Sequence, residues 1–114
     1  MRIKAGIWVS AYLRRVNAMA IPALVTRRGD GDAGAIFIKV NTLDGHAQVL
    51  RPATTAVEDA EFDRFWSFAF KAPRAEQEVD EYLMRQRDFD ADMWVIEVED
   101  KHGRHFIDNF ILAL

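Results

Sequence analysis

The sequence predicts an α+β fold in which two helices pack on one face of an antiparallel sheet of four to six strands. Two stretches carry apolar residues at helical spacing, and several short runs of β-branched and aromatic residues alternate with a period of two. Clusters of glycine and aspartate separate these runs, as expected for turns. Residues 1–114 are predicted to form a single domain, because domains commonly contain about 100–200 residues.

The first helix is predicted from Lys4 to about Ala20. At about 100° per residue, most of its apolar side chains fall within one arc, whereas Arg14 and Arg15 lie on the other side. Pro22 is expected to end the helix, since the residue before a proline is pushed out of helical geometry. The two arginines also interrupt the apolar run, so this segment is predicted to be a core helix and neither a signal peptide nor a membrane span.

The segments 23–28 and 35–41 are predicted to form a β-hairpin. They flank the sequence GDGDAG at 29–34, and glycine tolerates the positive φ that tight turns require. In this arrangement Arg27 and Lys39 would lie close together across the hairpin.

Asp44-Gly45 predicts a second turn, and the strand expected over about 46–50 completes a three-stranded antiparallel meander. Residues 51–61 are predicted to form a loop. The stretch 62–70 fits two patterns, because its aromatic residues alternate as in a strand but also match helical spacing. Aromatic enrichment and a nearby proline favour the strand, and the helix stays the alternative.

A second helix is predicted from about Arg74 to Asp88, with acidic residues in its first turns, where the helix dipole favours them. The run 93–98 is predicted to be a strand with its even-numbered apolar residues on one face. A turn is expected over 100–103, after which residues 104–112 could pair back onto the sheet.

Composition narrows the possible functions. The chain contains no cysteine, which excludes disulfide scaffolds, thiolate metal sites and cysteine nucleophiles and fits a cytoplasmic location. The net charge of −3 conceals an asymmetry. Eight basic and three acidic residues give +5 over 1–51, whereas seven basic and fifteen acidic residues give −8 over 52–114. Either the two halves pack together and partly neutralise each other, which is favoured, or a basic face serves an anionic partner.

Three patterns imitate ligand sites but lack an essential part. The acidic run 88–92 resembles a calcium loop, yet Met93 stands where such loops need glycine. The glycine-rich segment 29–34 lacks the Lys-Ser/Thr and the following helix of a phosphate-binding loop. His102 and His105 lie near a predicted turn without an identifiable third ligand. No metal-binding or cofactor-binding residue, and no cofactor, is therefore predicted.

Catalysis is the least favoured class of function. Ser10 and Ser67 lack the surroundings of an activated nucleophile. Glu97 and Glu99 share one face of a predicted strand, where a solvated acidic face explains them better than acid–base chemistry does. No catalytic residue is predicted.

The remaining candidate is a basic interaction surface on the first helix and the predicted hairpin. Its members are Arg14, Arg15, Arg27, Arg28 and Lys39. The leading hypothesis is a non-enzymatic protein-interaction module, which self-associates or binds an acidic protein through this surface. The alternative is a nucleic-acid or nucleotide binder that uses the same residues to neutralise phosphates. The acidic overall charge, the lack of a recognised motif and the expected burial of the aromatic residues argue against nucleic acid. No membrane partner is expected.

Three segments resemble a known family: GIWVSAYLRR at 6–15, RRGDGDAGAIFIKVN at 27–41 and RQRDFDADMWVIEVED at 85–100. The sequence is similar there to small uncharacterised proteins of alphaproteobacteria, grouped as domain of unknown function fourteen-ninety-one. The resemblance covers nearly the whole chain and is weakest over 52–73. It implies a cytoplasmic bacterial protein of one domain with no assigned activity, and it supplies no functional residues.

Overall fold

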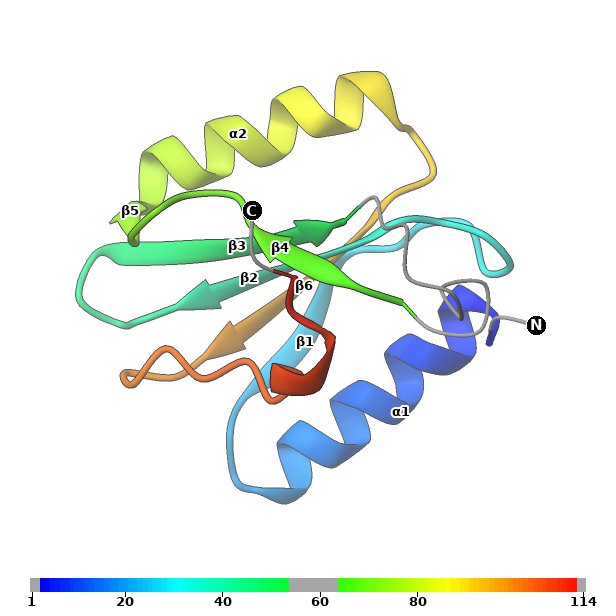
Figure 1. Cartoon of the computed structure of the whole chain (residues 1–114), viewed down its shortest axis with the longest axis horizontal. Helices are drawn as coiled ribbons and strands as arrows, with labels where there is room; N and C mark the ends of the chain where they lie inside the picture. The colour runs from blue at the N-terminus through cyan, green and yellow to red at the C-terminus, as the bar shows by residue number, and fades with distance from the viewer. Residues whose placement is uncertain (1–2, 54–63, 113–114) are drawn as a thin grey trace.

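The computed structural model describes residues 3–53 and 64–112, which form two α-helices, six strands and a short 3-10 helix (Figure 1). The elements in chain order are α1 (Ala5–Ala18), β1 (Ala23–Arg27), β2 (Ile36–Asn41), β3 (His46–Pro52), β4 (Trp66–Phe68), β5 (Arg74–Ala75), α2 (Glu76–Phe89), β6 (Trp94–Glu99) and η1 (Asp108–Phe110). The α+β class and the expected range of strand number are confirmed. Within the described ranges, no helix is long and apolar enough to cross a membrane.

The six strands form one mixed sheet with the order β1-β6-β2-β3-β4, and β5 pairs with β3. All pairs are antiparallel except β2 and β6, which run parallel. Because β6 lies between β1 and β2, the predicted hairpin of 23–28 with 35–41 does not form. The antiparallel meander consists instead of β2, β3 and β4.

The composition of the strands explains this order. β2 and β6 are buried along nearly their whole length, whereas β1 alternates between buried and exposed residues. Strands that are apolar on both faces belong in the middle of a sheet, and an alternating strand suits an edge. A hairpin between β1 and β2 would have left β6 at an edge or outside the sheet.

The segment 29–34 is a crossover loop rather than a hairpin turn. It passes the start of β6, where the Asp30 amide donates to the Asp92 carbonyl oxygen at 2.9 Å. A β-carbon at Gly29 or Gly34 would lie closer than 3.0 Å to this same carbonyl oxygen, so the close approach requires glycine. The loop also accepts hydrogen bonds from the first amides of α1, with Gly6 N–H donating to the Gly31 oxygen at 2.9 Å.

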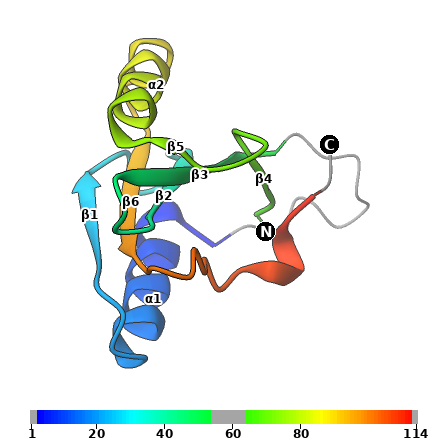
Figure 2. The same cartoon turned by 90° about the vertical axis from the view of Figure 1, so that its left-hand side faces the viewer.

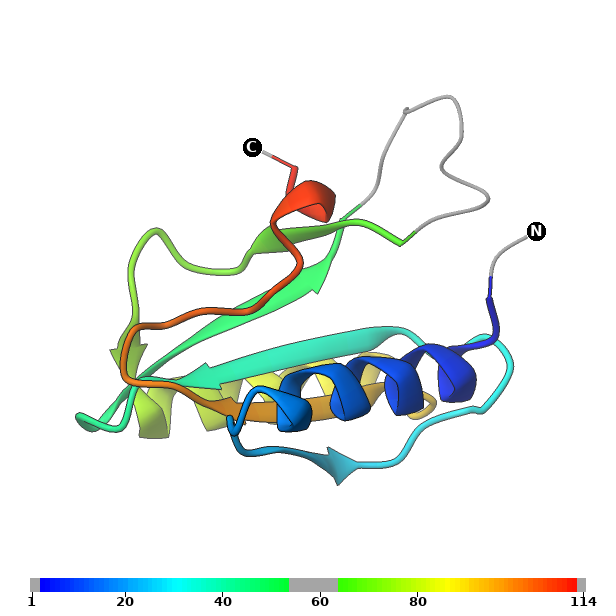
Figure 3. The same ribbon diagram turned by 90° about the horizontal axis from the view of Figure 1, so that it is seen from below.

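The two helices cover opposite faces of the sheet, which corrects the prediction that both pack on one face. Figure 2 shows the sheet between α2 above and α1 below, and in Figure 3 α1 lies in front of the strands and α2 behind them. Along β2, Ile36 and Ile38 pack in the core beneath α1, whereas Phe37 packs in the core beneath α2. The physical reason is that β2 and β6 bury apolar side chains on both faces, with Phe37 and Val95 on the face beneath α2, so each face needs its own cover.

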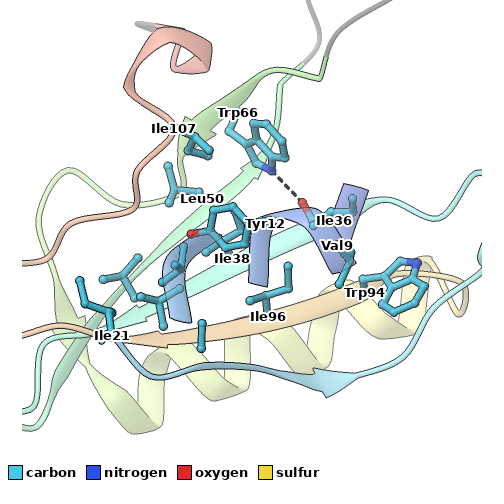
Figure 4. Close-up of a cluster of buried hydrophobic side chains, with 14 of the residues drawn as sticks. Val9, Tyr12, Ile21, Ile36, Ile38, Leu50, Trp66, Trp94, Ile96 and Ile107 are labelled. Atoms are coloured by element: carbon cyan, nitrogen blue, oxygen red, sulfur yellow. Dashed lines mark hydrogen bonds between the residues drawn. The ribbon is translucent and has the colours of Figure 1, made fainter. Parts of the chain in front are cut away.

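The larger core lies between α1 and the sheet (Figure 4). Trp66 of β4 is 1% exposed, and its indole Nε1–H donates to the Ile36 carbonyl oxygen at 2.9 Å. Trp8 stacks on Tyr12 with ring centroids 5.0 Å apart and also contacts the Trp66 ring at 4.9 Å. The Tyr12 hydroxyl donates to the His105 carbonyl oxygen at 2.7 Å, which ties the C-terminal segment to α1.

The aromatic stretch 62–70 contains β4, so the strand interpretation is confirmed for Trp66–Phe68, and residues 62 and 63 lie outside the described residues. Of the predicted loop 51–61, residues 51 and 52 belong to β3 and residues 54–61 lie outside the description. The turn over 100–103 is confirmed.

The segment 104–112 does not form a strand of its own. It contains η1 and makes an isolated parallel bridge from Ile111 to Trp66. The Leu112 amide donates to the Trp66 carbonyl oxygen at 2.8 Å, so the segment touches the edge of β4 at this point.

Candidate functional site

Lys39 is buried beneath α2 and is 5% exposed. Its ammonium Nζ lies 2.8 Å from Glu76 Oε2, 2.8 Å from Asp80 Oδ1 and 3.4 Å from Glu97 Oε1. Burial alone would lower the pKa of Lys39, but the hydrogen bonds to Asp80 and Glu76 and the charge of Glu97 outweigh it and raise the pKa. The residue is therefore a neutralised structural cation and does not face solvent as part of a basic surface.

Arg27 is also engaged within the fold. Its guanidinium donates to three backbone carbonyl oxygens: that of Arg28 at 3.2 Å, that of Met93 at 3.0 Å and that of Ala91 at 2.9 Å. Arg28 is exposed, and its guanidinium carbon lies 5.5 Å from the centroid of the Trp94 ring. Arg27 thus fastens the end of β1 to the turn before β6, and it does not lie beside Lys39.

Arg14 and Arg15 lie on α1, on the other face of the sheet from Lys39. Both are exposed, and Arg15 donates from Nη2 to the Phe106 carbonyl oxygen at 2.7 Å. The five predicted residues therefore do not form one continuous surface. Lys39, Arg27 and Arg15 instead contact groups from the acidic second half of the chain, in agreement with the favoured reading that the halves pack together.

The exposed flank of α1 carries a feature that the sequence analysis did not identify. Ile7 is 61% exposed and lies outside the apolar arc of α1 that packs on the sheet, and Ile3, two residues before the helix begins, is 55% exposed. Ala11 and Arg15 follow Ile7 at four-residue spacing and form one row with it on α1. In the sequence, an isoleucine outside the apolar arc of the predicted helix, Ile7, was the signal that could have indicated an apolar surface here.

This row forms one wall of a groove of about 300 Å³ between α1 and the C-terminal segment. Trp8 and Tyr12 line its floor, and Ile107 and Phe110 form the opposite wall. Arg15 supplies the charged end. We call this feature, lined by Ile3, Ile7, Trp8, Ala11, Tyr12, Arg15, Ile107 and Phe110, the α1 groove.

The lining of the α1 groove is mostly apolar and aromatic. Burial raises the pKa of Tyr12, against the opposing charge of Arg15, so its hydroxyl stays protonated at neutral pH. Among the described residues that line the groove there is no carboxylate or histidine. Among residues 3–53 and 64–112, no group of three or more histidine, cysteine, aspartate or glutamate side chains is placed to hold a metal ion. The α1 groove can accept apolar side chains, with a cation at one end.

Two other titratable side chains, Asp100 and His105, stabilise the segment that forms the far wall. Asp100 is 6% exposed, and hydrogen bonds from the Arg104 guanidinium and amide hold its pKa at about 2. Burial lowers the pKa of His105, against the charge of Asp108, and His105 Nδ1 accepts a hydrogen bond from the Ile107 amide at 3.2 Å. These contacts position the segment that forms the wall.

The fold and the groove define a class: a small mixed-sheet protein with a helix on each face and an apolar groove on the outer side of one helix. The chain belongs to the family described as "Protein of unknown function (DUF1491)", whose model matches residues 3–108. This finding confirms the family resemblance seen in the sequence.

Solved structures of the family share the fold. A crystal structure and an NMR structure of a DUF1491 family protein from Caulobacter crescentus CB15 are each 34% identical to this chain, with a TM-score of 0.80. The match covers 99% of this chain and 100% and 99% of those chains, respectively. The solution structure of protein Atu0922 from A. tumefaciens is 36% identical with a TM-score of 0.75, over 87% of this chain and 86% of that one. No curated protein matches this chain in sequence.

Proposed function

We propose that this protein is a cytoplasmic, single-domain, non-enzymatic interaction module that docks an apolar segment of a partner protein in the α1 groove. The observation that carries the proposal is the exposure of Ile3 and Ile7 along an apolar groove that ends at Arg15. Contiguous apolar surface with a polar rim is typical of protein-interaction sites. The absence of cysteine supports the cytoplasmic location.

The chemistry of the groove indicates the kind of partner. Amphipathic helices insert apolar side chains at i, i+3 and i+4 into such grooves. Complete burial of an exposed isoleucine side chain contributes about 1.5–3 kcal/mol, so Ile3 and Ile7 are suitable anchors. α1 contains no acidic residue, and Arg14 and Arg15 lie near one end. We therefore expect an amphipathic partner segment whose apolar residues are followed by carboxylates.

A selection from a displayed library of random peptides of about 16 residues tests this proposal. We expect the selected peptides to combine apolar residues at helical spacing with acidic residues. Ile7→Asp is expected to abolish their binding, and Arg15→Gln to weaken it. Leu24→Asp is the matched control, because Leu24 is 54% exposed but lies on β1, away from the groove.

Two results would count against partner docking in the α1 groove. If Ile7→Asp and Leu24→Asp bind the selected peptides equally well, the peptides use another surface. If sedimentation velocity shows a dimer that Ile7→Asp converts to a monomer, the groove is occupied by a second copy of the chain instead of a different protein.

A further inference from the structure

Phe68 in β4 stands between two surface hollows away from the α1 groove. One hollow, of about 550 Å³, is lined by β4, the residues that follow it and the C-terminal segment. The other, of about 530 Å³, lies between the turn joining β2 to β3 and the turn after β6. The Phe68 side chain lines both hollows and is 41% exposed. Its ring contacts His105 edge-on, with centroids 5.7 Å apart, and this contact holds it in place.

Basic side chains stand on both sides of the Phe68 ring. Arg51 and Lys71 line the first hollow, and Lys101 lines the second together with His46 and His102. Within the described part of the chain, none of the three cations Arg51, Lys71 and Lys101 forms an ion pair. Arg51 donates from Nε to Ser67 Oγ at 3.4 Å, and its cross-strand pairing with Ser67 places it on the face of the sheet opposite Phe68. Lys71 and Lys101 are therefore the cations available to an external anion beside the ring.

One carboxylate, that of Asp44, also lines the second hollow. It accepts hydrogen bonds from Thr42 Oγ1 at 2.6 Å and from the His46 amide at 3.1 Å. Its charge is thus partly compensated by the turn itself. Among the described residues that line the two hollows, Lys71 and Lys101 are unpaired cations and Asp44 is the carboxylate, although residues 52–114 as a whole are acidic.

We infer that this surface binds single-stranded nucleic acid, with one base stacked on Phe68 and the flanking phosphates held by Lys71 and Lys101. Burial of the aromatic residues, as expected from the sequence, would count against nucleic-acid binding, but Phe68 is 41% exposed. An exposed aromatic ring flanked by cations is the arrangement that proteins use to bind single strands without sequence preference. Cations on both sides of the ring suit a strand that crosses it, since the phosphates before and after the stacked base then each meet a basic residue.

Fluorescence anisotropy with a labelled deoxythymidine oligonucleotide of about 12 nucleotides tests this inference. We expect Phe68→Leu, which keeps an apolar side chain but removes the aromatic face, to weaken binding about tenfold. The Lys71→Gln/Lys101→Gln variant should weaken binding and make the dependence of the affinity on salt less steep, because each lost phosphate contact reduces the slope by about 0.7.

Matched variants provide the controls. Phe89→Leu removes an aromatic residue that is 88% exposed on α2, and Arg85→Gln/Arg87→Gln removes two exposed basic residues. Both controls are expected to bind like the wild type, as is Ile7→Asp, since the α1 groove is a different surface. Circular dichroism of each variant establishes that the fold is retained.

Three outcomes would overturn the inference. The first is no salt-dependent binding by the wild type. The second is an equal loss in the test and control variants, which indicates nonspecific attraction. The third is that adenosine monophosphate competes as well as the oligonucleotide does at equal concentration. The site would then bind a single nucleotide, and the phosphates on both sides of the stacked base would not contribute.

Discussion

Lys39 of β2 and Glu97 of β6 stand opposite each other on adjacent parallel strands, with Nζ 3.4 Å from Oε1. The two side chains meet because β6 is inserted between β1 and β2 and so becomes the neighbour of β2. Glu76 and Asp80 of α2 reach the same ammonium group, so Lys39 connects β2, β6 and α2.

We expect Lys39→Met to lower the free energy of unfolding by about 1–3 kcal/mol at pH 7, because three carboxylates would lose their shared cation. The cost stays below that of a fully buried pair, since Glu76 and Asp80 are about half exposed and can turn toward water. Urea denaturation measures the change. Lys101→Met, on the exposed turn after β6, is the control and should alter stability by less than about 0.5 kcal/mol.

The contribution of Lys39 should depend on pH in the alkaline range. Its pKa is raised in the folded protein, so its stabilising effect is complete below the unfolded pKa of about 10.4 and declines as the pH rises further. The stability difference between the wild type and Lys39→Met is therefore expected to shrink above that pH. A difference that stays constant to the highest accessible pH would contradict the assignment.

Gly29→Ala is expected to destabilise the protein by about 1–3 kcal/mol, since a β-carbon there would overlap the Asp92 carbonyl oxygen and the Trp94 ring. Gly31 lies in the same loop, but nothing lies within 4 Å of the corresponding position. Gly31→Ala should therefore leave the melting temperature nearly unchanged. Equal effects of the two substitutions would show that the loop does not cross β6 as described.

Asp100→Asn should lower stability at neutral pH by about 1–2 kcal/mol, because the charged hydrogen bonds with Arg104 are weakened. The folded pKa of Asp100, about 2, is below its unfolded value, so its contribution is present above about pH 4 and is lost as the pH falls through 2. Acid titration of the wild type should therefore lose more stability between about pH 4 and pH 2 than titration of the variant. Asp88→Asn, at an exposed position in α2, serves as the control.

His105 should make the protein less stable in mild acid. Burial lowers its pKa in the folded state, so the unfolded chain takes up a proton first as the pH falls below about 6.5. Asp108 Oδ1, at 3.7 Å from Nε2, opposes this effect only in part. We expect the wild type to lose stability between about pH 7 and pH 5 and His105→Asn to lose less. His102 is exposed, so His102→Asn should show the same pH dependence of stability as the wild type. If His105→Asn also shows the same pH dependence as the wild type, the role assigned to His105 is wrong.

Local periodicity predicts both helices, the strands β1, β2, β3, β4 and β6 and the face of β6 beneath α1, but it places Arg74–Ala75, which form β5, in the second helix. Trp94, Ile96 and Val98 pack in the core beneath α1, as their alternation indicates. Local periodicity could not predict that β6 separates β1 from β2, because strand pairing depends on contacts between residues far apart in the chain. The same limit placed Lys39 beside Arg27 instead of Glu97.

The α1 groove illustrates a second limit. The apolar arc of α1 correctly predicts Val9, Tyr12 and Val16 as buried residues. Ile7 lies outside that arc, and periodicity alone does not reveal that Ile107 and Phe110 lie opposite α1. The groove arises only when the C-terminal segment folds back beside the helix, held by the hydrogen bond from Tyr12 to the His105 carbonyl oxygen.

Titration of the ¹⁵N-labelled protein with a selected peptide identifies the surface on which the peptide docks. We predict that the amide signals of Ile7, Arg15 and Phe110 and the indole signal of Trp8 shift in a saturable manner, whereas those of Leu24 and Met84 do not. Saturable shifts confined to β1 or α2, with the signals around the α1 groove unchanged, would contradict the proposed function.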